Sequence, residues 1–176
     1  MRTKKYPKDS LAESSEIVLP NDTNTYGNLM GGRLMYMMDV VGAIAAQRHC
    51  NRAVVTASVD NVSFKNSPAL GDVITLEAKV TRAFNSSMEI YIKVVSEKPS
   101  KGTVTETNTA FFTFVAIDMA GNPITVPELI PETDQEKELY EGALRRRQLR
   151  LILAGRMSPD DATELKALFD KKLRKA

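Results

Sequence analysis

The sequence contains very few of the residues that build disulfides, metal centres or histidine-dependent active sites. It has one cysteine, Cys50, and one histidine, His49, among 176 residues. A single cysteine excludes an intrachain disulfide framework and fits a reducing compartment, so we expect a cytoplasmic protein. One His beside one Cys has no recognisable spacing for a metal site or a catalytic dyad, so we expect a structural role for His49 at a helix end.

The sequence also has no long apolar run and little net charge. Its most apolar stretch, residues 34–46, is too short to span a bilayer and carries Asp39 in its middle. Residues 1–19 are basic and polar, without the apolar core of a secretory signal. The net charge of +2 does not argue for nucleic acid, and the glutamates upstream of Arg145-Arg146-Arg147 favour pairing within one helix. We therefore expect no membrane span and no nucleic-acid partner.

The hydropathy pattern predicts an α+β domain with one buried helix. Residues 32–48 are apolar on nearly every side of the helix axis, which is typical of a helix buried on nearly every side. One helix cannot cover both faces of a sheet, so the antiparallel sheet should curl around it and hide its other surface in an oligomer. Alternation and turn residues predict five strands, at residues 14–19, 53–64, 73–82, 88–94 and 103–118, the third and fourth forming a hairpin.

The composition divides the chain into three segments. We expect a flexible N-terminal arm over residues 1–13, the domain over 14–127 and a helical C-terminal extension over 128–176. In the extension, Ser158 has the N-cap position and Pro159 the first position of the last helix. That helix has an apolar stripe expected to pack on the protein's own oligomer, formed by Leu165, Leu168, Phe169 and Leu173.

Asp39 is the most informative residue for function. It lies at the centre of the apolar helix, among Met, Val, Leu and Ala. An ionised carboxylate in apolar surroundings is costly without compensation, and a functional role is the simplest compensation. The alternative is a helix side that faces solvent.

The loop before this helix is dense in Asn, Asp, Thr and Gly and includes Asn24. Gly31 and Gly32, at the helix start, allow a ligand to approach the backbone closely, and helix N-terminal N–H groups favour developing negative charge. Gly31 and Gly32 are therefore candidate oxyanion groups. An ordinary glycine-rich turn is the alternative.

Several motifs follow one another along the chain. They are residues 22–32 (DTNTYGNLMGG), Met38-Asp39, Gly42-Ala43-Ile44, Arg48-His49-Cys50-Asn51, residues 54–60 (VVTASVD), Ser87-Met88-Glu89-Ile90, Val126-Pro127 and Pro131-Glu132-Thr133. As a set they resemble the hotdog-fold acyl-CoA thioesterases of the YciA and brain acyl-CoA hydrolase group, over roughly residues 14–140. The resemblance implies a curved antiparallel sheet of about five strands wrapped around a central helix.

The resemblance also implies a reaction and a set of residues. The reaction is hydrolysis of fatty acyl-CoA to free fatty acid and coenzyme A, at sites shared between subunits of a trimer of hotdog dimers. Asn24 matches the family's loop asparagine, which orients water or substrate, and Asp39 its helix aspartate from the opposite subunit, while Thr56 matches a strand threonine. Whether Asp39 is a general base or a nucleophile stays open. No metal or redox cofactor is needed, since coenzyme A is part of the substrate and the product.

Coenzyme A carries phosphate groups, which favour basic and hydroxyl donors. Candidates at strand ends and in the hairpin turn are Lys65, Arg82, Ser86, Ser87 and Lys98. For each of them, an ordinary solvated surface position is the alternative.

Two other functions are compatible with a hotdog fold. The first is a non-catalytic sensor or regulator that binds acyl-CoA. A version of it that reads DNA would need a helix-turn-helix, and none precedes the domain. A hydratase acting on acyl thioesters would use a histidine in the site, whereas His49 follows the helix.

Overall fold

The computed structural model describes residues 2–60, 62, 64 and 66–173. The chain divides into two compact units, residues 1–130 and 131–176. The first contains the sheet and the long helix, and the second contains the C-terminal helices.

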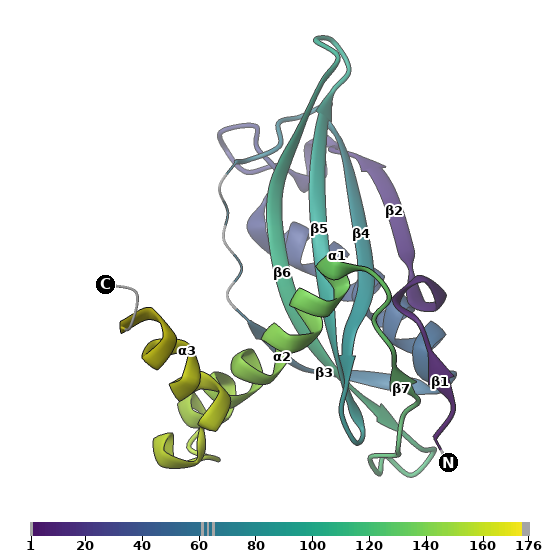
Figure 1. Ribbon diagram of the computed structural model, residues 1–176. Helices are drawn as coiled ribbons and strands as arrows, with labels where there is room; N and C mark the ends of the chain where they lie inside the picture. The colour runs from purple at the N-terminus through teal and green to yellow at the C-terminus, as the bar shows by residue number, and fades with distance from the viewer. Residues whose placement is uncertain (1, 61, 63, 65, 174–176) are drawn as a thin grey trace. The chain divides into compact units, whose positions relative to one another are not determined.

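The first unit is built on a five-stranded antiparallel sheet in the order β2-β4-β5-β6-β3. Figure 1 shows these strands curving across one long helix, α1 (Gly31–Cys50). The expected curled sheet around a single helix is therefore confirmed, as is the hairpin of the third and fourth strands. The strands are β2 (Ala12–Ile17), β3 (Ala53–Asp60), β4 (Val73–Ala83), β5 (Ser87–Lys98) and β6 (Thr103–Ile117).

The core lies between α1 and the concave face of the sheet. The predicted alternation holds, because the apolar residues of β4 share one fully buried face, Ile74, Leu76, Ala78 and Val80. Helix and sheet approach closely at Gly42, where an added Cβ would lie 3.0 Å from the Phe114 ring and 3.3 Å from Ile92. A glycine in mid-helix weakens the helix by roughly 1 kcal/mol relative to alanine, and here it permits this approach.

Strand β3 lies at the edge of the sheet and pairs only with β6 among the described residues. Its register shifts between Thr56 and Ser58, which places a bulge at Ala57. A bulge re-aims the side chains that follow it. The bulge explains why polar and apolar residues occur at both odd and even positions of this strand. The strand ends at Asp60 rather than at the predicted Phe64.

Helix α1 corrects one expectation from the sequence. It is not buried on every side within the chain, because one side packs on the sheet and the other is exposed. Four large apolar residues on the outer side have 38–60% of their surface exposed: Met35, Tyr36, Val40 and Ile44.

The segment over residues 2–13, expected to be a loose arm, has regular hydrogen-bonded structure. Strand β1 (Lys4–Lys5) pairs in parallel with β7 (Glu128–Leu129), and the 3-10 helix η1 (Pro7–Ser10) follows. Strand β2 starts two residues earlier than predicted, at Ala12. A second 3-10 helix, η2 (Pro20–Asp22), opens the loop that leads to α1.

The second unit contains α2 (Asp134–Leu153) and α3 (Thr163–Leu173). Helix α2 begins with a capping box in which Thr133 accepts from the Glu136 N–H and the Glu136 side chain accepts from the Thr133 N–H. Ser158 and Pro159 do not start the last helix as predicted. They start a 3-10 turn, η3 (Pro159–Asp161), where Ser158 accepts from the Asp160 N–H. Of the predicted apolar stripe, the side chains of Phe169 and Leu173 lie outside the described part.

Candidate active site

The structure joins two of the residues that the sequence singled out. The Thr56 hydroxyl donates a hydrogen bond of 2.6 Å to Oδ1 of Asp39. In the described part of the chain, Oδ2 of Asp39 has no hydrogen-bond donor. One carboxylate oxygen is thus held and the other is available to a ligand.

Strand register explains how Thr56 reaches the helix. Thr56 lies opposite Phe114 on β6, and directly opposed residues project from the same face of a sheet. Phe114 is buried under α1, so Thr56 also projects toward α1. The strand ahead of the bulge at Ala57 is therefore what brings the hydroxyl to Asp39.

Asp39 is half-buried in the chain rather than enclosed. It lies at the border of the two sides of α1, between the fully buried Met38 and the exposed Val40. This differs from the expected apolar enclosure, since a second surface would have to cover Asp39 before a reaction there could be shielded from water.

Asn24 has a defined orientation in the loop before α1. Its Oδ1 accepts from the backbone N–H groups of Tyr26, at 2.9 Å, and Asn28, at 3.2 Å. Because both partners are donors, the atom facing them must be the oxygen. The Nδ2 group has no acceptor among the described residues, so it is free to donate. Within the described chain, Asn24 forms no hydrogen bond with Asp39.

The start of α1 has the features expected of an oxyanion site. Its N-cap residue, Met30, makes no side-chain capping bond, so the first N–H groups are not satisfied by a cap. An added Cβ at Gly32 would meet nothing within 4 Å, whereas at Gly31 it would lie 3.3 Å from the Phe64 ring. Gly32 therefore borders open space, and Phe64 lies beside Gly31.

The candidate coenzyme A residues do not form one cluster within the chain. Arg82, Ser86 and Ser87 lie at the β4–β5 turn, where the Arg82 guanidinium stacks on Phe84 at 5.7 Å. Lys98 lies at the other end of β5, roughly 36 Å away by strand geometry. It lines a small polar hollow of about 190 Å³ with Asp72. Lys65 lies outside the described residues.

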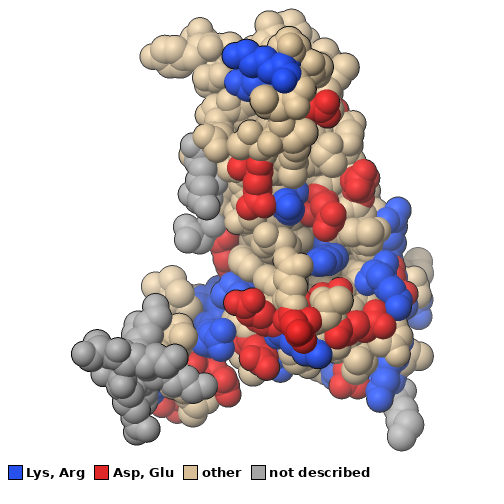
Figure 2. Space-filling model, turned by 45° about the horizontal axis from the view of Figure 1, so that its top comes forward, with Lys and Arg blue, Asp and Glu red and all other residues tan. Residues whose placement is uncertain are grey.

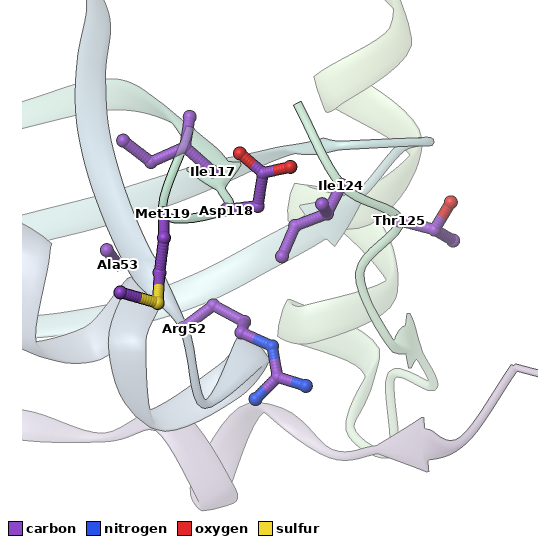
Figure 3. Close-up of a pocket in the computed structure, with 7 residues that line it drawn as sticks. All are labelled: Arg52, Ala53, Ile117, Asp118, Met119, Ile124 and Thr125. Carbon is purple, nitrogen blue, oxygen red and sulfur yellow. The ribbon is translucent and has the colours of Figure 1, made fainter. Parts of the chain in front are cut away.

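Two hollows that the sequence did not indicate lie near the C-terminal end of α1. Figure 3 shows the first, of about 580 Å³, which is lined by Arg52, Asp118, Met119 and other residues. In this view the Arg52 guanidinium points away from the Asp118 carboxylate. The second, of about 520 Å³, shares Arg52 and Thr125 with the first and includes residues 2–5. The cluster of basic residues at positions 2, 4 and 5 was the only sequence signal for it.

His49 and Cys50 are buried at the same end of α1. The carbonyl of Pro127 can only accept, so Nε2 of His49 donates the 3.0 Å hydrogen bond between them. Burial lowers the pKa of His49 despite this bond and raises the pKa of the Cys50 thiol. Both groups are neutral near pH 7, which suits a structural role.

Asp118 belongs to a turn rather than to a reactive site. Its carboxylate accepts from the backbone N–H groups of Ala120 and Asn122 and from the Asn122 side chain. Hydrogen bonds from Asn122 lower the pKa of this exposed carboxyl. Its oxygens are thus committed to the turn.

Figure 2 shows acidic and basic side chains interspersed over much of the face that it presents, in keeping with the small net charge. Within the described residues, no group of three or more potential ligands could hold a metal ion. None of the described helices is both long enough and apolar enough to cross a bilayer.

The curved five-stranded sheet and its single helix are the hotdog fold, and the comparisons with known proteins agree. The thioesterase superfamily profile matches residues 26–103. The chain is 40% identical over 142 residues to the uncharacterized acyl-CoA thioester hydrolase YkhA of Bacillus subtilis, covering 81% of this chain and 83% of that protein. The chain therefore belongs to the thioesterase superfamily, among the acyl-CoA thioester hydrolases.

Solved structures extend the likeness. An apo hexameric acyl-CoA thioesterase has a TM-score of 0.84 and 40% identity, covering 86% of this chain and 97% of that one. The acyl-CoA hydrolase of Staphylococcus aureus, in complex with butyryl coenzyme A, coenzyme A and coenzyme A disulfide, has a TM-score of 0.80 and 34% identity, covering 93% and 99%. That hydrolase has also been solved with one Asp, one Asn or one Thr replaced by alanine, at 33–34% identity and TM-scores of 0.79–0.82, covering 86–95% of this chain and 96–99% of those chains.

Proposed function

We propose that this protein hydrolyses fatty acyl-CoA to a free fatty acid and coenzyme A. The observation that carries the proposal is the Thr56 to Asp39 hydrogen bond, which holds a half-buried carboxylate with one oxygen available. A thioester carbonyl is attacked readily by a water molecule whose proton is being removed. Neither a metal nor a redox cofactor is required for this chemistry.

In this mechanism Asp39 acts as a general base. Its Oδ2 takes a proton from water while the water oxygen bonds to the thioester carbonyl carbon, giving a tetrahedral oxyanion. The carbon–sulfur bond then breaks, and the protonated Asp39 returns the proton to the departing coenzyme A sulfur. Direct attack by Asp39, through an anhydride, would use the same free oxygen.

Asn24 and the start of α1 would stabilise the oxyanion. The free Nδ2 of Asn24 is a donor, so it suits the carbonyl oxygen, which accepts. The N–H groups at Gly31 and Gly32 lie at the positive end of the helix dipole. Because Oδ1 is already occupied, this orientation favours donation to the substrate over acceptance of a hydrogen bond from the attacking water.

The site would be completed by a second subunit. The exposed apolar side of α1 and the open edge of β3 both border Asp39, which is only half-buried in one chain. Covering this surface with a second copy would remove apolar area and an unpaired strand edge from water. We infer that Asn24 of one subunit faces Asp39 of the other, and that three such dimers assemble into a hexamer.

A relative supports the assignment of all three residues. The Asn, Asp and Thr replaced in the Staphylococcus aureus hydrolase are separated by the same numbers of residues as Asn24, Asp39 and Thr56. Residues chosen for substitution in that enzyme thus correspond in spacing to the three residues proposed here.

The test is thiol release from a panel of acyl-CoA esters. The wild-type protein should release coenzyme A, and Asp39→Asn, which keeps the shape of the side chain, should lower kcat by about 10²- to 10⁴-fold. A wild-type protein that releases no thiol while binding acyl-CoA would instead support a sensor. Full activity of Asp39→Asn would overturn the mechanism.

The shared site has its own test. Asn24→Ala and Asp39→Ala are each expected to be inactive, and mixing them should restore activity because some interfaces then pair intact residues from different subunits. Native mass spectrometry would verify subunit exchange. No recovery despite exchange would show that each site uses residues of one chain.

A further inference from the structure

A concave surface at the C-terminal end of α1 gathers basic side chains from two distant parts of the sequence. The hollow measures about 520 Å³ and its lining includes Arg2, Lys4, Lys5 and Arg52. We call it the basic hollow. Strand β1 brings the first three residues there by pairing with β7, and Arg52 follows the left-handed cap residue of α1, Asn51.

None of these four cations is neutralised within the described residues. Arg2, Lys4, Lys5 and Arg52 form no salt bridge there, although Glu128 lies opposite Lys4 in the β1–β7 pair. Their hydrogen bonds go to neutral groups. Arg2 donates to the Phe84 carbonyl and the Asn85 side chain, Lys5 to the Arg48 carbonyl, and Arg52 to the Asn51 carbonyl.

Four like charges gathered in one hollow repel one another, so an anion there would be bound favourably. By contrast, Arg33 at the other end of α1 has two carboxylate partners, Asp22 at 2.9 Å and Glu16 at 3.2 Å. The comparison indicates that the basic hollow is a binding surface rather than a structural ion-pair network.

The distance to the proposed reaction centre identifies the anion. Cys50, in the wall of the hollow, lies eleven residues beyond Asp39 in α1, roughly 16 Å along the axis. Arg52 lies four residues before Thr56, roughly 13 Å along an extended chain. In coenzyme A, about thirteen bonds separate the thiol sulfur from the first phosphorus, which spans roughly 15 Å when extended.

The hollow also adjoins the β4–β5 turn. The Val126 N–H, in the wall of the hollow, donates to the Asn85 carbonyl at 3.0 Å. Arg2, near the N-terminus, also donates to this turn, through the Phe84 carbonyl and the Asn85 side chain. The turn leads directly into Ser86 and Ser87, whose hydroxyl groups are suitable phosphate donors.

We propose that the basic hollow binds the phosphate groups of coenzyme A while the thioester lies at Asp39 and Thr56. The proposal rests on the proposed hydrolase function. It assigns substrate recognition to the N-terminal segment and Arg52, and it leaves Lys98, at the far end of β5, outside this phosphate site.

The test compares two substrates in one variant. Lys4→Gln combined with Arg52→Gln should lower kcat/KM for butyryl-CoA by roughly 10- to 100-fold, mainly through KM, because charge-assisted contacts to phosphate are lost. Butyryl-pantetheine has no phosphate groups, so its kcat/KM should not change. The matched control, Lys79→Gln combined with Lys101→Gln, removes the same charge elsewhere and should leave both substrates unaffected.

Three results would overturn the proposal. The first is an unchanged KM for butyryl-CoA, and the second is an equal loss for both substrates, which would indicate a structural effect. The third is loss of inorganic phosphate binding, measured by calorimetry, with unchanged coenzyme A affinity, which would assign the hollow to free phosphate. If the wild-type protein hydrolyses neither substrate, the proposed function fails, and calorimetry with coenzyme A still tests the hollow.

Discussion

The two sides of α1 have similar apolar character and opposite surroundings. On the inner side, Leu34, Met38, Val41 and Ala45 are at most 2% exposed against the sheet. On the outer side, Met35, Tyr36, Val40 and Ile44 are 38–60% exposed. A helix that is apolar all round needs two covering surfaces, and the sheet supplies only one of them. The outer side is therefore the surface through which we propose that two copies associate.

Asp39 lies at the border of these two sides. Within the chain, Thr56 holds one carboxylate oxygen of Asp39, and the residue as a whole is only half-buried. Association would thus do two things at once, covering apolar surface and closing the reaction site. Substitutions on the outer side should therefore affect mainly the association of subunits, and substitutions on the inner side should affect mainly the stability of the fold.

The largest effect is expected from a charge on the outer side. Val40→Glu places a carboxylate where the subunits would meet, and an unpaired buried charge costs several kcal/mol. We expect monomers and at least about a 100-fold loss of thioesterase activity. Light scattering after size-exclusion chromatography and thiol release would measure both. Val40→Ala, which adds no charge, is the control and should stay associated. An active, associated Val40→Glu protein would exclude the outer side as the interface.

The next effect concerns the inner side. Met38→Ala should lower the free energy of unfolding by about 2–5 kcal/mol, because it removes a fully buried side chain and leaves a cavity. Denaturant unfolding measures this loss, and the oligomeric state should not change below the transition. If Met38→Ala dissociates the protein while Val40→Glu does not, the roles of the two sides are reversed.

The sequence predicted the sheet and helix well because alternation along β4 and β5 depends only on neighbouring residues. It failed where long-range partners decide the outcome. The helix pattern could not distinguish a side covered by the sheet from a side left open, since Leu, Met and Val occur on both. The prediction that Ser158 caps the last helix was wrong for a local reason, because a 3-10 turn and an α-helix accept the same N-cap residue.

The third effect tests how Thr56 positions Asp39. Thr56→Val keeps the shape of the side chain and removes the hydroxyl, and a hydrogen bond to a charged group contributes about 1.5–3 kcal/mol. We expect kcat to fall by roughly 10- to 100-fold with little change in KM. Thr56→Ser should restore most of the activity. A raised KM without loss of kcat would mean that Thr56 binds substrate instead.

The candidate site was only partly accessible from the sequence. Asn24, Asp39 and Thr56 are recognisable in the motifs. The bond between Thr56 and Asp39, however, depends on the register of β3 against β6, which no local pattern shows. The basic hollow depends on the parallel pairing of β1 with β7, which brings residues 2–5 to the same hollow as Arg52. Two-residue strands have no periodicity, so the N-terminal segment was interpreted as an arm.

The smallest effect is a pH dependence of stability caused by His49, which is buried in the last turn of α1. Burial lowers the pKa of His49 in the folded chain, and Nδ1 is buried without a hydrogen-bond partner among the described residues. Well above pH 6.5 His49 is neutral in both the folded and the unfolded state and adds no pH dependence. As the pH falls below 6.5, the unfolded chain binds a proton that the folded chain does not, so stability decreases by up to about 1.4 kcal/mol per pH unit. Unfolding measured between pH 5 and 8 should show this slope in the wild-type protein and a shallower one in His49→Gln. Equal slopes in the wild-type protein and in His49→Gln would show that another group causes the pH dependence, and that the buried end of α1 contains no pH-sensitive residue.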